Sequence, residues 1–427
     1  SPTACAVPRP RRTLEFFRSS PAMLRNLMTV SGFTLLSRVL GLVRDILMSK
    51  VFGTTAVSDA FFTSFRFPNM FRRVFGEGAF NAAFIPQFAR ALEEESKNEA
   101  NEFANQALSW LVWTLGIGTL IALPLMRWIM AGFAPGFLVP EGHQFTWDWF
   151  WQMVRYPHGT EKFEITVSWA RIMFSYLLCM ALVAQMSGVM NTLKRFGIPA
   201  FAPVLLNIVF IGTLSVAAFK NVGPEGAGEW LSWGVCSAGF LQLMLLTIGC
   251  QLCGVKVRIR RPRRSARINK LFSKMGPGVI SAGVQQINLM VGTQIASVQA
   301  IAVSYLYYAE RIYQFPLGMI GVAFGVVLLP EISRCLRAEK MQEAVQTLRD
   351  GLTFSMLLTV PATVAMLVIP GEIAYTLFYW GSPFSVPEVS KALMGFAVGI
   401  PAYVLIKVLQ PAYFAQEDTK TPMFMAG

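Results

Sequence analysis

The chain has 427 residues, of which 54% are hydrophobic and 14% are charged. Soluble domains carry about 25% charged residues, so this composition excludes an ordinary soluble protein and indicates a polytopic membrane protein. The formal net charge is +13; in a membrane protein such an excess usually gathers in cytoplasmic loops, and it does not by itself indicate nucleic-acid binding.

The N-terminal stretch differs in composition from everything that follows. Residues 1–22 are rich in proline and arginine, and they lack the apolar core and small-residue cleavage site of a signal peptide. We therefore expect a disordered stretch here, and a cytoplasmic extension over residues 1–27.

Ten apolar segments follow, each long enough to cross a bilayer at about 20 residues per crossing. They cover residues 28–52, 57–92, 106–131, 166–192, 200–220, 229–254, 272–299, 301–336, 349–380 and 388–415. The segments 57–92, 301–336 and 349–380 exceed one crossing, and their internal prolines predict kinks or a continuation beyond the bilayer. The sequence thus predicts an all-α polytopic membrane protein.

Lysine and arginine gather on one side of this predicted arrangement. They occupy the N-terminus and the loops 193–199, 255–271 and 337–348, whereas the loops on the opposite side contain few of either. The positive-inside rule places the basic side, with the N-terminus, in the cytoplasm. We interpret the most basic loop, 255–271, as a topology anchor that joins two halves; contact with anionic lipid headgroups is the functional alternative.

Charged residues lie well inside the first two apolar segments. The first carries Arg38, Arg44 and Asp45, and the second carries Asp59, Arg66, Arg72, Arg73 and Glu77. A charge at the bilayer centre costs about 2.5–3.5 kcal/mol on translocon scales, so these side chains are expected to face water or protein. A polar cavity inside a helix bundle would satisfy them.

Helical periodicity gathers these residues into stripes. Ser37, Gly41 and Arg44 share one face of the first segment, with Arg38 and Asp45 on an adjacent face. A similar stripe in the segment 301–336 contains Tyr307, Glu310, Arg311 and Gln314. Buried ion pairs that lock helices would explain single pairs, but the arginines outnumber the acidic residues. Surplus buried cations favour an anionic ligand, and a planar guanidinium suits phosphate.

A short internal repeat indicates two related halves. The stretch from Arg66 to Pro86 resembles the stretch from Gln314 to Pro330, with a register difference of four residues. Both copies cross in the same direction, as in the parallel repeats of some transporters. We therefore predict a first lobe of six helices over 28–254, a basic cytoplasmic linker over 255–271, and a second lobe over 272–427.

The sequence shows little that favours an enzyme. The pair Cys250 and Cys253 has no second pair to complete a zinc site, and His143 and His158 lie together in one loop without partners. The glycine-rich spots match neither a P-loop nor a dinucleotide fingerprint. We expect no cofactor and no metal.

Several ordered motifs together resemble the MurJ (MviN) family of lipid II flippases. The matching stretches are Ser37-Arg-Val-Leu-Gly41-Leu-Val-Arg44-Asp45, Asp59-Ala-Phe-Phe, Pro68-Asn69, Arg72-Arg73, Glu77-Gly-Ala-Phe80, Arg195-Phe-Gly-Ile-Pro-Ala-Phe-Ala-Pro203, Tyr307-Tyr-Ala-Glu-Arg311, Phe315-Pro316 and Asp418-Thr-Lys-Thr-Pro422. The resemblance extends from about Met23 to the end of the chain.

The resemblance implies the fold of the multidrug/oligosaccharidyl-lipid/polysaccharide exporter superfamily, in which two helical lobes face each other around a central cavity. It also implies a bacterial inner-membrane location, a role in peptidoglycan synthesis and lipid II as substrate, moved by alternating access. By motif it assigns substrate binding to Arg38, Arg44, Arg72 and Arg311. It assigns polar support of these arginines to five further residues: Ser37, Asp45, Asp59, Glu77 and Glu310. Arg66 and Arg73 are expected to be peripheral.

Two features depart from the family pattern. Residue 310 is Glu where Asp is also common, and the chain ends at Gly427, where an eleventh helix is expected to begin. We therefore expect an incomplete second lobe that does not flip lipid on its own. The sequence also allows three alternatives: another exporter of the superfamily, a membrane enzyme acting on polyprenyl pyrophosphate, or a scaffold that binds other cell-wall synthesis proteins.

Overall fold

The structure is a computed structural model, which describes residues 21–73, 80–140, 146, 148, 151, 159–338, 340–381 and 383–415. Over these residues the elements are helices, and no β-strand occurs among them. In chain order they are α2 (Pro21–Phe52), α3 (Ala56–Phe71), α4 (Phe80–Glu94), α5 (Lys97–Phe133), the 3-10 helix η2 (Pro135–Leu138), α7 (Glu161–Thr192), α8 (Gly197–Phe219), α9 (Pro224–Leu252), α10 (Ala266–Val298), α11 (Ala302–Arg337), α12 (Met341–Val368), α13 (Pro370–Phe378) and α14 (Val386–Ala415).

The prediction of an all-α membrane protein is confirmed. Among the residues searched, six helices are long and apolar enough to cross a bilayer: α5, α7, α8, α9, α12 and the 386–409 part of α14. Among the described residues each predicted segment lies mainly in helix. The helix count differs from the prediction because two segments each contain two helices and because the short η2 lies outside the predicted segments. The segment 57–92 contains α3 and α4, and 349–380 contains α12 and α13.

The division of 349–380 has a local cause. Ile369 precedes Pro370, and a residue before proline is pushed out of the helical conformation by the ring of that proline. Ile369 accordingly has φ −125° and ψ 43°, and α13 begins at Pro370, where a missing N–H costs nothing. In α3 and α4, by contrast, Pro68 and Pro86 lie inside the helices.

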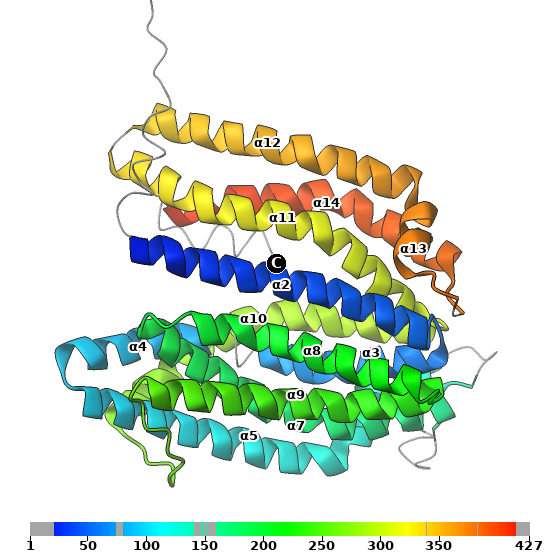
Figure 1. Cartoon of the computed structure of the whole chain (residues 1–427), viewed down its shortest axis with the longest axis horizontal. Helices are drawn as coiled ribbons and strands as arrows, with labels where there is room; N and C mark the ends of the chain where they lie inside the picture. Colours follow the sequence, from blue (N-terminus) through cyan, green and yellow to red (C-terminus); the bar gives the residue numbers. More distant parts are fainter. Residues whose placement is uncertain are drawn as a thin grey trace, which may run out of the picture.

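The helices form a bundle with two groups on either side of α2 (Figure 1). On one side α11 packs against α14 and α12. On the other, α7 packs against α9, α3 and α5, and α2 packs against α8. Helix α10 contacts α4, α5 and η2 as well as α11.

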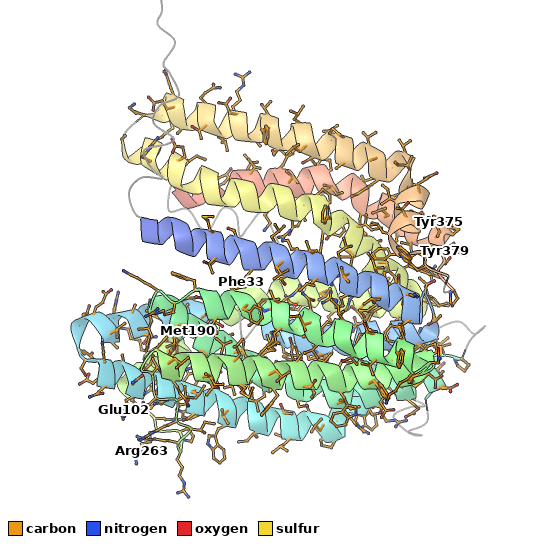
Figure 2. The ribbon with its side chains drawn as sticks, in the orientation of Figure 1. Phe33, Glu102, Met190, Arg263, Tyr375 and Tyr379 are labelled. Carbon is orange, nitrogen blue, oxygen red and sulfur yellow. The ribbon has the colours of Figure 1, made fainter. Side chains whose placement is uncertain are left out.

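The bundle has two ends, each marked by a pair of labelled residues. Tyr375 and Tyr379 stack with ring centroids 4.7 Å apart at one end, and Glu102 and Arg263 lie toward the other (Figure 2). We call these the Tyr379 end and the Arg263 end. Helix α2 begins toward the Arg263 end and runs to the Tyr379 end (Figure 1).

Aromatic side chains hold the two groups together near the Tyr379 end. Phe62 of α3 stacks on Tyr307 of α11 with centroids 3.7 Å apart and contacts Tyr308 edge-on at 5.5 Å. Gly53, after α2, has φ +59° and lies against the carbonyl of Pro383. A side chain at position 53 would be strained and would collide with that backbone, so glycine permits the close approach.

Candidate functional site

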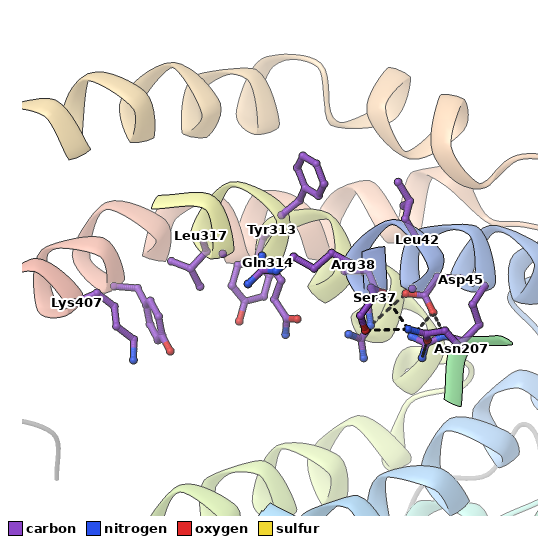
Figure 3. Close-up of a pocket in the computed structure, with 15 residues that line it drawn as sticks. Ser37, Arg38, Leu42, Asp45, Asn207, Tyr313, Gln314, Leu317 and Lys407 are labelled. Carbon is purple, nitrogen blue, oxygen red and sulfur yellow. Dashed lines mark hydrogen bonds and ion pairs between the residues drawn. The ribbon is translucent and has the colours of Figure 1, made fainter. Parts of the chain in front are cut away.

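A cavity of about 660 Å³ lies between α2 and α8 on one side and α11 and α14 on the other. Its lining residues from α2 and α8 are Ser37, Arg38, Gly41, Leu42, Arg44, Asp45 and Asn207; those from α11 and α14 are Arg311, Tyr313, Gln314, Phe315, Leu317, Gly318, Tyr403 and Lys407. In Figure 3, Asp45 and Asn207 lie at one end of the lining and Lys407 at the other. The sector predicted from Ser37, Gly41 and Arg44 therefore faces this cavity.

The guanidinium of Arg44 is held by two neighbours. Its Nε and Nη2 donate to Oδ1 of Asp45 at 2.9 and 2.8 Å, and its Nη1 donates to Oδ1 of Asn207 at 3.0 Å. Asn207 in turn donates from Nδ2 to the carbonyl and the hydroxyl of Ser37 at 2.9 and 3.2 Å. Arg44 and Asp45 are both buried. The contacts with α8 therefore fix Arg44 in one orientation at the cavity wall.

Arg311 approaches the same carboxylate from α11. Its Nε lies 3.6 Å from Oδ2 of Asp45, and its guanidinium carbon lies 4.8 Å from the centroid of the Tyr307 ring. The hydroxyl of Tyr307 donates to Oδ1 of Asp45 at 3.1 Å. The Nε of Arg311 is buried without a hydrogen-bond partner among the described residues. Arg311 is thus held less tightly than Arg44.

Arg38 and Lys407 extend the positive charge along the lining. Arg38 is exposed to the cavity, and its guanidinium lies so close to Gly318 that a Cβ atom there would collide with it. The Nζ of Lys407 lies 5.5 Å from the ring centroid of Tyr403, one turn earlier on α14. The described lining thus has four cations and one acidic residue, and an anion is the ligand that this surplus favours.

Arg72 lies outside this cluster. It follows α3, and its Nε donates to Oδ1 of Asn69 at 3.1 Å; it is not among the cavity-lining residues. Arg66, expected to be peripheral, pairs with Glu310 at 3.5 Å, and Gln314 donates to the same carboxylate at 2.6 Å. The sequence expectation for Glu77 falls outside the described residues.

Asp59 lies at the Tyr379 end, away from the cavity lining. Its carboxylate is fully buried and accepts hydrogen bonds from two other helices. Lys162 of α7 donates to Oδ2 at 2.6 Å, and the backbone N–H and hydroxyl of Ser304, in the first turn of α11, donate to Oδ1 at 2.7 and 2.6 Å. Ser58 and Ser304 share a further hydrogen bond of 2.7 Å. We call these four residues the Asp59 latch, because they join α3 and α7 to α11.

The sequence reasoning missed three residues of these sites. Asn207 and Lys162 are 163 and 103 positions away from their partners Arg44 and Asp59, and no local pattern pairs them. Lys407 could have been found, because it is the one charged residue in the apolar stretch 392–415. The same cost of a charge at membrane depth applies to it.

The chain is similar to known proteins over most of its length. A model of the family "Lipid II flippase MurJ" matches residues 48–426. A probable lipid II flippase MurJ of Rhizobium meliloti is 40% identical over 410 residues, which cover 95% of this chain and 73% of that protein. The lipid II flippase MurJ of Burkholderia cenocepacia is 34% identical over 411 residues, covering 95% of this chain and 75% of that protein.

Solved structures show the same fold. A lipid II flippase MurJ in an inward closed conformation matches with a TM-score of 0.75 at 24% identity, covering 93% of this chain and 78% of that one. An inward-facing multidrug-resistance MATE transporter matches with a TM-score of 0.66 at 12% identity, covering 91% of this chain and 83% of that one. At these identities the structures support a common architecture of helical lobes around a central cavity.

Proposed function

The chain belongs to the lipid II flippase MurJ family, and from this premise we propose that its cationic cavity binds lipid II by the pyrophosphate of its headgroup. The protein is a flippase, which makes it a transporter rather than an enzyme. The observation that carries the proposal is the cluster of Arg44 and Arg311 around Asp45 in a lining with four cations and one acid. A guanidinium binds two phosphate oxygens at once, which suits it to this ligand.

We propose that the protein lies in the bacterial inner membrane with the Arg263 end in the cytoplasm. The loops at that end carry most of the lysine and arginine, as the positive-inside rule requires. Lipid II would then enter the cavity from the cytoplasmic leaflet and leave it toward the periplasm. The Asp59 latch would close the periplasmic side in the conformation described above.

Asp45 acts in this proposal as an internal counter-ion. In this structure it accepts hydrogen bonds from Arg44 and lies beside Arg311, so these two cations are partly neutralised. The pyrophosphate carries more charge and more acceptor atoms, and it draws Arg311 away from Asp45. Arg44 stays where Asn207 holds it. A ligand shared by α2 and α11 binds one arrangement of the lobes better than another, which is what alternating access needs.

We propose that the other residues assigned by the resemblance contact the rest of the headgroup. Arg38 and Lys407 would meet the headgroup nearer the cytoplasmic mouth, with Ser37 and Glu310 as polar support. Arg72 would contact it away from the described cavity, and Glu77 would support it there. The lobes 28–254 and 272–427 would rock about the linker 255–271 while the polyprenyl tail stays in lipid.

A hydrolase of polyprenyl pyrophosphate would need an acid–base pair free to act. In the described lining Asp45 is the one acidic residue, and its Oδ1 already accepts from Arg44 twice and from Tyr307. Release of inorganic phosphate from undecaprenyl pyrophosphate is the activity that this alternative predicts.

Lipid II translocation by the full-length protein in proteoliposomes tests the proposal. Lipid II should become accessible to a membrane-impermeant reagent on the opposite leaflet, and a polyprenyl glycolipid without phosphate should not. The phosphate-free lipid is the control because it keeps the tail and the sugars. Equal transport of both lipids would contradict pyrophosphate recognition.

Gly318→Ala should displace Arg38 without unfolding the protein. The methyl group would collide with the far end of a flexible side chain, so Arg38 moves rather than the backbone of α11. We expect lipid II transport to fall roughly tenfold, the value of one charged contact, and the loss to be no larger in Gly318→Ala/Arg38→Ala than in Arg38→Ala. Gly399→Ala on α14, where a Cβ meets open space, is the matched control. Additive losses in the double variant would contradict this role.

A further inference from the structure

The basic loop that joins α9 to α10 has a fixed backbone rather than a loosely solvated one. We call residues 256–264 the basic strap. Asn105 of α5 donates to the carbonyl of Lys256 at 2.8 Å and accepts from the N–H of Arg258 at 2.9 Å. Ser109 accepts from the N–H of Arg260 at 2.9 Å, and Trp110 donates to the carbonyl of Arg263 at 3.1 Å. Four hydrogen bonds from one helix therefore hold the strap along α5.

This backbone arrangement turns the cations of the strap outward. Val255 is buried and Val257 is half-buried against the core, whereas Lys256 between them and residues 258–261 after them are exposed. Six exposed cations result: Lys256, Arg258, Arg260, Arg261, Arg263 and Arg264. Arg263 lies on the outer side of α5 in Figure 2. None of the salt bridges between described residues uses these six side chains.

The sequence of α5 gives the depth at which the strap lies. Residues 97–106 are mostly polar, and residues 107–126 are apolar over about the 20 residues that one crossing needs. Trp113 and Trp128 are 47% and 42% exposed toward the two limits of this apolar stretch, where tryptophan favours the membrane interface. The strap contacts α5 between Asn105 and Trp110, which is the level where the polar part ends.

Ile259 adds an apolar element to this surface. It lies between Arg258 and Arg260, and its side chain is 60% exposed. An exposed isoleucine between two arginines at the interface can enter the acyl boundary while the guanidinium groups stay among the headgroups.

We infer that the basic strap is a binding surface for anionic phospholipid headgroups of the leaflet at the Arg263 end. A cluster of cations beside a membrane-spanning helix attracts such lipids. Because the hydrogen bonds to α5 already order the strap, binding does not have to offset the conformational entropy that a flexible loop would lose. The bound headgroups hold the α5 side of the bundle to that leaflet. The surface is separate from the lipid II cavity, so its occupancy does not depend on the function proposed above.

The test is lipid selectivity of the full-length protein in mixed micelles of phosphatidylcholine with a minor fraction of phosphatidylglycerol. The ratio of the two lipids that elute with the protein measures selectivity. Each cation near an anionic surface strengthens binding roughly fivefold, so Arg258→Gln/Arg260→Gln/Arg261→Gln should lower the affinity for phosphatidylglycerol about a hundredfold. High salt should weaken binding to the wild type in the same direction.

Two further variants distinguish an effect of the ordered basic strap from an effect of the total positive charge at this end of the protein. Lys194→Gln/Arg195→Gln/Lys340→Gln removes three exposed cations from other loops at the same end and should leave selectivity unchanged. Asn105→Ala/Ser109→Ala keeps every cation but removes three of the hydrogen bonds that order the strap, and should give an intermediate loss.

Wild-type selectivity in the strap charge variant would overturn the inference, and so would equal losses in the two charge variants. Full selectivity in Asn105→Ala/Ser109→Ala would overturn the assignment to an ordered surface. Binding of lipid II, with no preference for phosphatidylglycerol, would assign the strap to substrate instead and refute the proposed occupant. All variants are compared at equal yield of monodisperse protein by gel filtration.

Discussion

Arg44→Ala should abolish lipid II transport, with a loss of roughly a hundredfold or more. The substitution removes the two charge-assisted hydrogen bonds that the guanidinium would donate to the pyrophosphate, worth about 1.5–3 kcal/mol each. It should also leave the buried Asp45 without its main partner. Breaking a buried ion pair destabilises a protein by about 3–5 kcal/mol. The single variant therefore combines a loss of binding with a loss of stability.

The double variant Arg44→Ala/Asp45→Ala separates the two effects. Without the carboxylate, the charge left unpaired is that of Arg311, whose side chain is 33% exposed. Thermal stability should therefore return part of the way toward that of the wild type. Transport should stay absent, because the pyrophosphate still lacks Arg44. Arg44→Lys keeps the charge but loses the planar fork, and intermediate transport is expected. Transport that recovers together with stability would show that Arg44 is structural.

Asp59→Asn should release the Asp59 latch. The substitution keeps the shape of the side chain but leaves Lys162, which is 18% exposed, without its anion. Because water can partly solvate the ammonium group, the cost should be up to about 3 kcal/mol, the lower end for a buried pair. Amide hydrogen exchange over residues 300–308 measures the effect directly, since the N–H of Ser304 donates to Asp59. We expect faster exchange there, a lower melting temperature and a loss of transport.

Asp59→Asn/Lys162→Met is the matched control for this prediction. It removes the unpaired charge together with its partner, and methionine keeps the apolar stem beside Phe137. Melting temperature and exchange should then move back toward the wild type. Unchanged exchange over 300–308 in Asp59→Asn alone would mean that the latch does not hold the first turn of α11.

Much of the fold could be predicted from hydropathy alone, because about 20 apolar residues are needed wherever the chain crosses a bilayer. The same pattern could not locate the polar ends of helices. Helix α5 begins at Lys97, nine residues before its predicted start, where Ser96 caps it by accepting a hydrogen bond from Glu99. Nor could it divide 349–380, although the proline that begins α13 was visible in the sequence.

The candidate site, too, could be predicted from the sequence only in part. Helical periodicity was enough to gather Ser37, Gly41 and Arg44 on one face, because those contacts depend on a single helix. The partner that orients Arg44 lies on α8, and the cation that compensates Asp59 lies on α7. Such pairs depend on how distant helices pack, and a single sequence contains no signal for that.

In the orientation proposed above, the Asp59 latch also affects how often the periplasmic side opens in the absence of substrate. Lys162 belongs to the same group of helices as Asp59, whereas Ser304 belongs to the other. When the lobes separate, the carboxylate keeps its cation and loses only the two hydrogen bonds from Ser304, which water then replaces. A bias of a few kcal/mol corresponds to an open population of roughly 0.1–10%. The empty carrier would thus spend most of its time facing the leaflet that supplies its substrate, yet sample the other side often enough that modest binding energy can reverse the balance.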